Sequence, residues 1–415
     1  MNKKFYVLVF FISLILVSPP AFAWQKIVSI PYYSQVSANW TGPASAKMIL
    51  ESPVITAHSA YAYKAQEQLW SYINAHSDPA WNPLYPGIHT DPYAMRECLK
   101  EYDTRPGFTY VIHDTPTYSS IISQKIVYTI DHYDVPPAVP IDGGLNWVGV
   151  FGVDTTSDPS LGPYSINWFL INDPRDPVLG NNRYISYFSW ENNGSSSVFI
   201  HIATPNPFPD NLLKIAVCDP EAPGPLKVEA PMPPPRRETT LSPKEAREAA
   251  LEAIKKYNLV DKPEFQNAQK RIRLGNPILV KRMTAAVQAD YYIVPLVKRY
   301  FIFWKKLTAA VLIDAFSGAF LEASGAKKTI SYPYLTLSLK RAKAILSRKI
   351  QKIEGIAQRD LKVEMPTLIW KPGLSVNPYF PLWESRAVIK GVDTIRYLDF
   401  EKNVQSPLYY PSKEK

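Results

Sequence analysis

In the second half of the chain, apolar positions twice follow a helical period, and strand-like runs come after each helical segment. The period is helical over Ala246–Tyr257 and again over Leu335–Ile353. The strand-like runs are Ala289–Lys298, Phe301–Trp304, Thr308–Asp314, Ala319–Ala323, Pro366–Trp370, Tyr379–Trp383 and Val388–Phe400. This order predicts two small α+β modules, in each of which a helix covers one face of an antiparallel sheet.

Helix-start and turn signals support these boundaries. Ser242 is placed as an N-cap, Pro243 follows in the first turn, and Glu245 has the spacing of a capping box. The segments Asp314–Gly318 and Asp399–Asn403 predict turns between strands, and the glycine that ends the first segment is free to take a positive φ.

The first half also mixes strand-like and helical segments. A short apolar run starts at Ile27, and after a polar loop the step Gly42–Pro43 leads into an apolar helix. A second helix is predicted over Tyr93–Tyr102. Proline makes up 39 of the 415 residues, which argues against an all-helical fold. The fold class predicted for the whole chain is therefore α+β.

The N-terminus has the three parts of a secretory signal peptide. Lys3 and Lys4 form a basic start, Phe5–Val17 is uncharged and apolar, and Ala21–Ala23 is an A-x-A-like end. The apolar core is shorter than the roughly 20 residues that span a bilayer. We therefore predict cleavage after Ala23, a secreted or extracytoplasmic protein, and no transmembrane segment in its mature form.

Proline content and charge divide the mature chain. Residues 219–241 are rich in proline, which favours an extended spacer, so we predict an interdomain linker there. The predicted order is signal peptide 1–23, first domain 24–218, linker 219–241, and two α+β modules at 242–325 and 326–415. The first domain carries a formal charge of −7, whereas the chain after residue 218 carries +14. The basic half is expected to contact the acidic half, a partner protein or an anionic cell envelope. No nucleic-acid-binding motif accompanies this charge.

Histidine and cysteine spacing gives no support for a metal site or a cofactor. None of the six histidines lies in an H-x-x-x-H or C-x-x-C setting. Cys98 has the pattern of a small buried apolar residue in a helix, and Cys218 lies at the edge of the first domain. A disulfide between them is the alternative, and sequence spacing does not decide it.

The segment that ends in Asn39-Trp40-Thr41-Gly42-Pro43-Ala44 resembles the entry of papain-like cysteine peptidases of the bacteriocin-leader-processing type and their secreted bacterial relatives. In that family a cysteine before Gly-Pro-Ala is the nucleophile at the start of a helix, and a glutamine in the preceding loop helps to form the oxyanion hole. Gln35 lies at the expected spacing, but the nucleophile position holds Thr41. Ser45, one helical turn further on, would sit deeper along the helix.

The resemblance continues downstream and covers most of Ile27–Ile202. The family's base histidine begins a strand, and the matching position here is Asn146. Asp173, in the sequence Asn-Asp-Pro at a strand end, matches the aspartate that orients that histidine. The resemblance implies a papain-like first domain, with an N-terminal helix packed on an antiparallel sheet. Asp173 has the alternative role of shaping a turn before proline.

The two exchanged positions are the ones that perform the family's chemistry. A threonine hydroxyl is a poor nucleophile without a base, and the amide of Asn146 does not usefully titrate. Loss of one essential member of a triad also leaves the others with little effect. Hydrolysis of the papain type is therefore not expected. Gln35 and Trp40 are candidate peptide contacts, and Trp147 is a candidate cleft wall or a core residue.

The second half, with Asp314-Ala-Phe-Ser-Gly318 between apolar strands, resembles PepSY-type domains, which are suspected of binding or inhibiting peptidases. A small α+β repeat without a binding role is the other interpretation. Three functional hypotheses remain. The first is an exported pseudopeptidase that binds or shields peptides or regulates a peptidase at the cell envelope. The second is a hydrolase with a non-standard site, and the third is a structural envelope protein.

Overall fold

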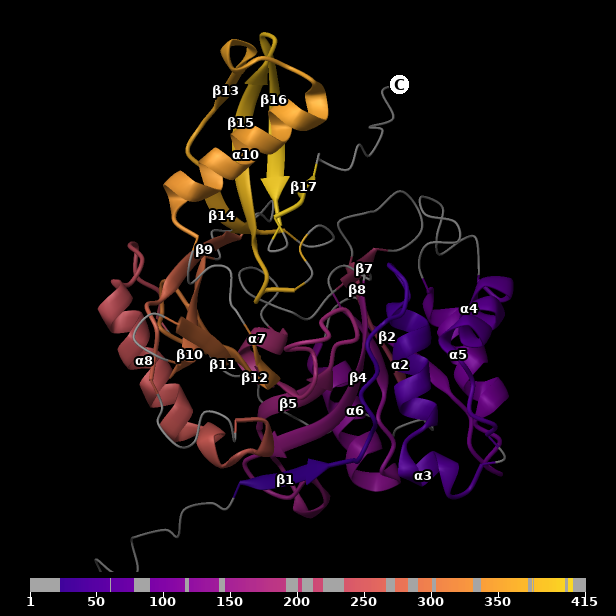
Figure 1. Cartoon of the computed structure of the whole chain (residues 1–415). Coiled ribbons are helices and arrows are strands. Elements are labelled where there is room, and N and C mark those ends of the chain that lie inside the picture. Colours follow the sequence, from indigo (N-terminus) through magenta and orange to yellow (C-terminus); the bar gives the residue numbers. More distant parts are fainter. Residues whose placement is uncertain are drawn as a thin grey trace, which may run out of the picture.

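The computed structural model describes most of the chain between residues 23 and 405. The described residues are 23–59, 61–77, 90–115, 119–141, 146–191, 201–203, 212–218, 235–265, 273–282, 290–300, 304–330, 337–371, 375, 377–399 and 402–405. They form a mixed α+β structure, as predicted (Figure 1). The signal-peptide prediction lies outside these residues except for Ala23. Within them, no helix is long and apolar enough to cross a membrane.

The first half contains six helices and eight strands in its described residues. The helices are α2 (Thr41–Leu50), α3 (Pro53–Thr56), α4 (Gln66–Ala75), α5 (Pro92–Tyr102), α6 (Ser119–Tyr133) and α7 (Tyr187–Glu191). The strands are β1 (Trp24–Ile27), β2 (Val111–Thr115), β3 (Ala138–Ile141), β4 (Asn146–Thr155), β5 (Ile166–Asn172), β6 (Arg183–Ser186), β7 (His201–Ala203) and β8 (Leu212–Cys218). The helix predicted over Tyr93–Tyr102 is confirmed as α5.

The first-half strands form one antiparallel sheet with helices on both faces. The sheet runs β2–β8–β3–β4–β5–β6, and β1 pairs with the far end of β4. Neighbouring residues of a strand point to opposite faces, so Trp147 packs with α2, α4 and α5, whereas Val148 packs with α6. The ten residues of β4 are all buried because both faces are covered.

The second half contains two more helices and nine strands in its described residues. The helices are α8 (Pro243–Lys256) and α10 (Leu339–Glu354). The strands are β9 (Ile278–Arg282), β10 (Tyr291–Tyr300), β11 (Trp304–Asp314), β12 (Phe320–Ile330), β13 (Leu361–Val363), β14 (Thr367–Trp370), β15 (Leu382–Ile389), β16 (Val392–Leu398) and β17 (Val404–Gln405). As predicted, each helix covers a sheet face: α8 packs on β10–β12, and α10 packs on the sheet that contains β13–β16.

The local signals at the start of α8 and in the first turn are confirmed. The Ser242 side chain accepts a hydrogen bond from the Glu245 N–H, and the Glu245 carboxylate accepts one from the Ser242 N–H, which completes the capping box. In the turn after β11, the Asp314 carboxylate accepts hydrogen bonds from the Phe316 and Ser317 N–H groups, and Gly318 has φ 77°. Each signal involves residues within four positions of one another, so the sequence alone was sufficient to place it.

The prediction of a single strand over Val388–Phe400 is wrong. The chain turns at Lys390 and Gly391, which both have positive φ (50° and 84°), and β15 and β16 pair on either side of this two-residue turn. Two positive φ values in succession match the primed hairpin turns, whose twist fits antiparallel strands. Lysine is not a typical residue for the first position of such a turn. Because the residues on both sides are strand-like, the sequence contains no clear signal of a hairpin here.

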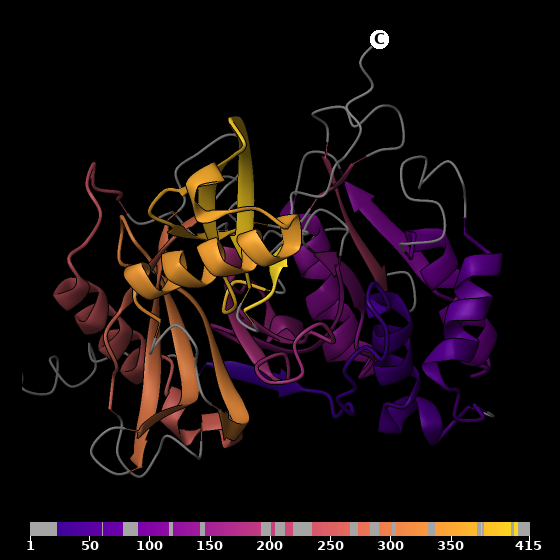
Figure 2. The same ribbon diagram turned by 45° about the horizontal axis from the view of Figure 1, so that its top comes forward.

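The two halves share one hydrogen-bonded ladder. Strand β6 of the first half pairs with β12, with Tyr184 opposite Ala323 and Ile185 opposite Glu322. The ladder continues through β11, β10 and β9, and then through a parallel pairing of β9 with β14. Figure 2 shows the orange strands of the second half beside the first half, with α10 across the front. The two halves of the chain are thus joined edge to edge.

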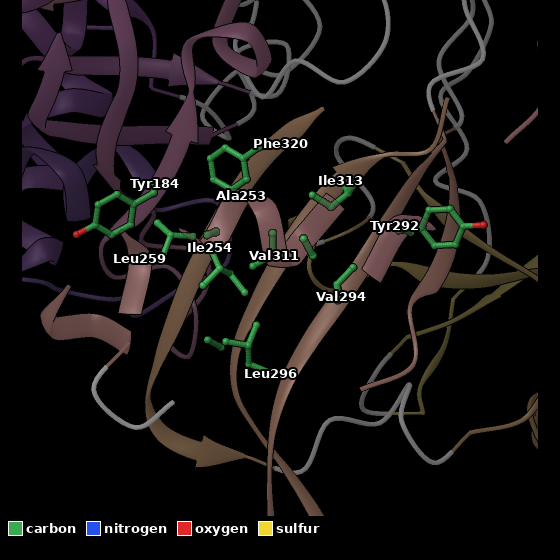
Figure 3. Packing of buried hydrophobic residues seen from close by; sticks show 14 of the residues in the cluster. Tyr184, Ala253, Ile254, Leu259, Tyr292, Val294, Leu296, Val311, Ile313 and Phe320 are labelled. Carbon is green, nitrogen blue, oxygen red and sulfur yellow. The ribbon is translucent and has the colours of Figure 1, made fainter. Parts of the chain in front are cut away.

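Buried side chains from both halves also pack together where β6 meets β12. Tyr184 of β6 belongs to one buried cluster with Ile254 of α8, Leu259 and Phe320 of β12 (Figure 3). Of the predicted linker, residues 219–234 lie outside the described residues. Its last residue, Leu241, is buried, and its N–H donates a hydrogen bond to the Ala315 carbonyl. The chain is therefore already anchored on the second half before α8 begins.

Candidate functional site

Thr41, at the position predicted for a nucleophile, is the first residue of α2. Its side chain is buried, and its Oγ1 accepts a hydrogen bond from the backbone N–H of Trp147 at 3.0 Å. One turn later, the Ser45 hydroxyl donates to the Trp147 carbonyl at 2.8 Å. Two hydroxyls on one face of α2 therefore hold the backbone of Trp147 at the start of β4. Ser45 is completely buried, which agrees with the prediction that it sits deeper than Thr41.

Trp147 is itself fixed at this helix start. Its indole Nε1 donates to the Thr90 carbonyl at 2.7 Å, and only 1% of the residue is exposed. Of its two predicted alternatives, the structure therefore favours the core residue. The Thr90 side chain lies so close to Gly42 that a Cβ at Gly42 would overlap it. Glycine at this position is required by that close approach.

Asn146, at the predicted base position, lies beside Trp147 at the start of β4 and is fully buried. Its Nδ2 donates a hydrogen bond to Asp173 Oδ1 at 3.1 Å. Asp173 follows directly after β5 and is also fully buried. The predicted pair of side chains is therefore in contact, and an amide takes the place that a histidine would need for proton transfer. The Asn146 Oδ1 has no hydrogen-bond partner among the described residues.

The second oxygen of Asp173 is held by a cation. Arg183 NH1 lies 2.5 Å from Asp173 Oδ2, and Arg183 NH2 lies 2.8 Å from Oε2 of Glu322 on β12. All three side chains are buried. Burial lowers the pKa of Arg183, but the charges of Glu322 and Asp173 outweigh it and raise the pKa above its usual value. Burial raises the pKa of Glu322, and Arg183 opposes that rise.

Asp173 also shapes the turn that follows it, which is the alternative role that the sequence left open. Its N–H donates to the Gly180 carbonyl at 2.7 Å, and its Oδ1 accepts from the Arg175 N–H at 3.0 Å. A Cβ at Gly180 would overlap the carbonyl oxygens of Asp173 and Asp176. The two roles of Asp173 therefore coexist: the same side chain orients Asn146 and closes the 173–180 turn.

The loop that carries Gln35 packs against this turn. The Gln35 N–H donates to the Pro174 carbonyl at 2.9 Å, and the neighbouring loop residues are held by the Gln66 side chain of α4. The Gln35 Oε1 is buried and has no hydrogen-bond partner among the described residues. Trp40 is half-buried and stacks on Trp70, with 5.7 Å between the ring centroids. The four predicted site positions thus converge at the N-terminus of α2.

The sequence analysis did not identify the residues that hydrogen-bond to the four site positions or to their neighbours and hold them in place. Arg183, Glu322, Gln66 and Thr90 come from separate elements, and no spacing signal connects them. Arg183 and its acidic partner Glu322 on β12 are 139 residues apart in the sequence. Contacts of that sequence separation depend on which strands become neighbours.

The arrangement does not provide the elements of papain-type chemistry. The recorded hydrogen bond at Thr41 Oγ1 comes from a backbone N–H, which is not a base. Asn146 cannot take a proton at neutral pH, and Thr41, Asn146 and Asp173 are each less than 5% exposed. The orphan oxygens of Gln35 and Asn146 can accept hydrogen bonds, so the surroundings suit donors better than an oxyanion.

A separate groove of about 400 Å³ lies where α8 faces β5, α7 and the start of β12. Tyr187, Phe188, Tyr257 and Phe320 supply aromatic surface, and Lys256 lies at the same groove. Its volume falls in the range of small-ligand sites, which often occur at domain interfaces. Sequence analysis did not predict it because its two walls come from different halves.

Among the described residues, the two cysteines and the possible metal ligands do not form a second candidate site. Cys98 and Cys218 are both buried and are present as thiols, so the disulfide alternative does not occur here. Burial raises the pKa of Cys98, which makes its thiol inert. Within the described ranges, no group of three or more His, Cys, Asp or Glu side chains is placed to hold a metal ion. Neither family models nor curated protein sequences matched this chain, so geometry and chemistry carry the functional argument.

Proposed function

We propose that this protein is an exported pseudopeptidase, in which a papain-like first domain recognises or shields peptides without cutting them. On this proposal a PepSY-like second half is fused to it and adds contacts to a peptidase or to the cell envelope. The secretory signal peptide expected at residues 1–23 would place both halves outside the cytoplasm. The peptide or the peptidase partner is thus an extracytoplasmic one.

The observation that carries the proposal is the bond between Asn146 and Asp173. In a working triad this aspartate orients a titratable base, but here it orients an amide at 3.1 Å. The hydroxyl at the nucleophile position is engaged with the Trp147 backbone and buried. These contacts between the four positions support the proposal, while the cysteine and the histidine that would perform the chemistry are replaced by Thr41 and Asn146.

Peptide recognition would use the rim of this site. Gln35 has a buried amide oxygen that no donor of the described residues satisfies, and a bound peptide that reaches it would supply a backbone N–H. Trp40 is half-buried beside Trp70 and has apolar surface available at the mouth of the loop. Val36, next to Gln35, is 62% exposed. These residues lie in a partly exposed loop outside the helices and strands, which suits a binding rim better than a catalytic floor.

The test is a cleavage assay on a diverse peptide library, read by mass spectrometry. It compares the protein starting at Trp24, its Thr41→Ala variant, and the double variant Thr41→Cys/Asn146→His. We expect no cleavage by the wild type. Cleavage that Thr41→Ala abolishes would establish an active hydrolase with a threonine nucleophile. Cleavage that survives Thr41→Ala would place the chemistry elsewhere.

The site assignment has its own readout, which does not need a substrate. In the Thr41→Cys variant, the rate of alkylation of the new thiol by iodoacetamide reports its thiolate fraction. Adding Asn146→His should raise this rate near pH 6, because an imidazolium beside a helix N-terminus stabilises the thiolate. Cys98 and Cys218 are buried, and the wild type gives their background. An unchanged rate would mean that positions 41 and 146 do not form a pair of the papain type.

A structural envelope role is the second candidate, and one observation favours it. Asp173 is tied through Arg183 to Glu322 of the second half, so the former site serves as a junction between halves. Peptide binding measured by fluorescence polarisation separates the two candidates. Peptide binding by the wild type that is lost in Gln35→Ala and Trp40→Ala supports the pseudopeptidase. The structural role predicts that neither the wild type nor these variants bind peptides specifically.

A further inference from the structure

A groove of about 400 Å³ lies where the two halves meet, and the proposed function does not use it. Its walls are α8 on one side and β5, α7 and the start of β12 on the other. On α8, Ala249 and Ala253 lie one turn apart and leave space because their side chains are small. Phe320 of β12 and Ala253 belong to one buried cluster (Figure 3). The groove is therefore built from packed elements of both halves.

Two opposite charges lie at the rim of this groove. Glu252 and Lys256 both line it, are exposed and lie one turn apart on α8. Neither forms an ion pair within the described part of the chain, whereas Lys244 and Glu248, nearer the start of α8, lie 4.0 Å apart. A ligand of a single charge is attracted by one of the two rim groups and repelled by the other. The rim therefore suits a ligand that carries both charges.

The first residues of β5 add an unpaired strand edge to the groove. Among the described residues, β5 pairs with β6 only from Trp168 onward, because after Ser186 the chain leaves the ladder and forms α7. Ile166 and Asn167 precede this pairing and line the groove. The open edge of a strand is a template for main-chain hydrogen bonds with an extended peptide. This edge therefore favours a ligand with a peptide group.

Aromatic surface and dimensions narrow the class of ligand further. Tyr257 and Phe320 line the groove with their ring centroids 4.7 Å apart. Such rings offer a large apolar surface to the side chain of a ligand. Residues one turn apart on a helix have Cβ atoms about 6 Å apart, and an extended dipeptide spans about 7 Å at most. The two ends of a dipeptide can therefore reach Glu252 and Lys256 together.

We propose that this groove binds dipeptides that have free termini and an apolar side chain. The ammonium group pairs with Glu252, and the carboxylate pairs with Lys256. The apolar side chain packs on Tyr257 and Phe320, while the peptide group bonds to the edge of β5. The inference goes beyond the proposed function and does not rest on it, because the groove shares no residue with the rim at Gln35.

Other small ligands match fewer of these groups. A single amino acid has both charges but no peptide group for the strand edge, and a neutral sugar has neither charge. A free anion or cation is repelled by one of the two rim residues. A dipeptide is therefore the smallest ligand that uses the charges, the strand edge and the aromatic surface together.

The experiment is isothermal titration calorimetry of the chain from Trp24 with leucyl-phenylalanine, its N-acetylated form and its C-terminal amide. The test variants are Glu252→Gln and Lys256→Gln. The matched controls are Glu248→Gln and Lys244→Gln, which make the same changes on α8 at exposed residues outside the groove lining. Thermal unfolding of each variant checks that the fold is retained, since surface substitutions of this kind have small effects on stability.

We expect the free dipeptide to bind the wild type, and each blocked end to weaken binding about five-fold, as for the loss of one exposed ion pair. N-acetylation should cost nothing more in Glu252→Gln, and amidation should cost nothing more in Lys256→Gln. The two control variants should bind all three peptides as the wild type does. Ala249→Leu, which fills part of the groove, should weaken the binding of all three peptides.

The absence of binding at millimolar dipeptide, equal losses in the test and control variants, or binding that does not respond to blocked ends would each overturn the proposal. Loss of binding in Gln35→Ala but not in the groove variants would place the dipeptide at the rim of the candidate site. That result would overturn the groove as the binding site and leave the proposed function standing.

Discussion

Arg183 and Glu322 are 139 residues apart in the sequence, yet their side chains form a fully buried ion pair at 2.8 Å. Arg183 lies on β6 of the first half and Glu322 on β12 of the second, directly where the two strands pair. Because Arg183 also pairs with Asp173, one guanidinium connects the end of β5 in the first half to the second half. The two halves are therefore coupled through charge as well as through the sheet.

Replacing Arg183 should be far more costly than replacing Glu322. Arg183→Met leaves two buried carboxylates, Asp173 and Glu322, without their cation, and we expect a loss of about 3–5 kcal/mol in the free energy of unfolding. Glu322→Gln should cost less, because Asp173 still balances Arg183. Urea denaturation of each variant measures the difference.

The exposed pair Arg386–Asp393 is a matched control for this prediction, because both of its side chains are more than half exposed. Asp393→Asn should cost less than about 1 kcal/mol. The loss in Arg183→Met should also shrink at acid pH, where protonation removes the unpaired charges. Equal effects of the buried and the exposed substitutions would contradict the coupling.

Thr41→Val should destabilise the protein by about 1–3 kcal/mol, although the two side chains are nearly isosteric. The substitution leaves the buried N–H of Trp147 without its acceptor, and the cost of an unsatisfied buried donor has this size. Thr41→Ser retains the oxygen and should cost less. Thermal unfolding followed by circular dichroism provides the comparison, with Thr56→Val on α3 as a control for the loss of a hydroxyl. A neutral Thr41→Val would rule out a structural role for this hydroxyl.

Gly180→Ala should be strongly destabilising, by about 3 kcal/mol or more. The added Cβ would overlap backbone carbonyl oxygens of Asp173 and Asp176, which cannot move without opening the turn. Gly149→Ala is the control, because its Cβ would meet only side-chain atoms, the flexible end of Ile30 at 3.4 Å and Ile49 Cγ1 at 3.9 Å. Guanidinium denaturation of both variants tests this ordering. The reverse ordering would show that the 173–180 turn is not rigid.

The stability of the fold should fall as the pH drops from 6.5 to 4, partly because of His113. Burial, with the charge of Lys125 in addition, lowers the pKa of His113 from 6.5 to about 4. The unfolded chain therefore binds a proton in this interval that the folded chain does not bind, and stability is lost as the pH falls. His113→Phe should remove up to about 3 kcal/mol of this pH dependence. If the free energy of unfolding of the wild type and of His113→Phe changes equally with pH in this range, His113 does not contribute to the pH dependence.

The sequence predicted the features that depend on residues close together in the chain, and it missed those that depend on contacts between distant residues. The capping box of Ser242 and Glu245 and the turn at Asp314 were predicted correctly, because residues within four positions satisfy each other. The hairpin at Lys390 and Gly391 was missed, because its strands have continuous strand-like composition and its first turn residue is a lysine. Strands β9 and β13 were also missed, because each is short and has a partner that is not the next strand in sequence: β14 for β9 and β15 for β13.

The candidate site follows the same distinction. The positions Gln35, Thr41, Asn146 and Asp173 were named from the resemblance to papain-like peptidases, and the structure brings them together around the start of α2. Their burial, however, was not predictable from this resemblance. It arises from the packing of Thr90 and Trp147 on one side and from the Arg183 network on the other.

By itself, the sequence determined the α+β class, the helix starts and turns, and the presence of Thr41 and Asn146 at two of the candidate site positions. These features depend on residue identity and on neighbours within a few positions. Only the tertiary structure decided that the two halves join through β6 and β12, and that Asp173 is bound to a cation shared with Glu322. Such contacts form when distant strand edges meet, and the free energy that selects those edges comes from packing the whole molecule.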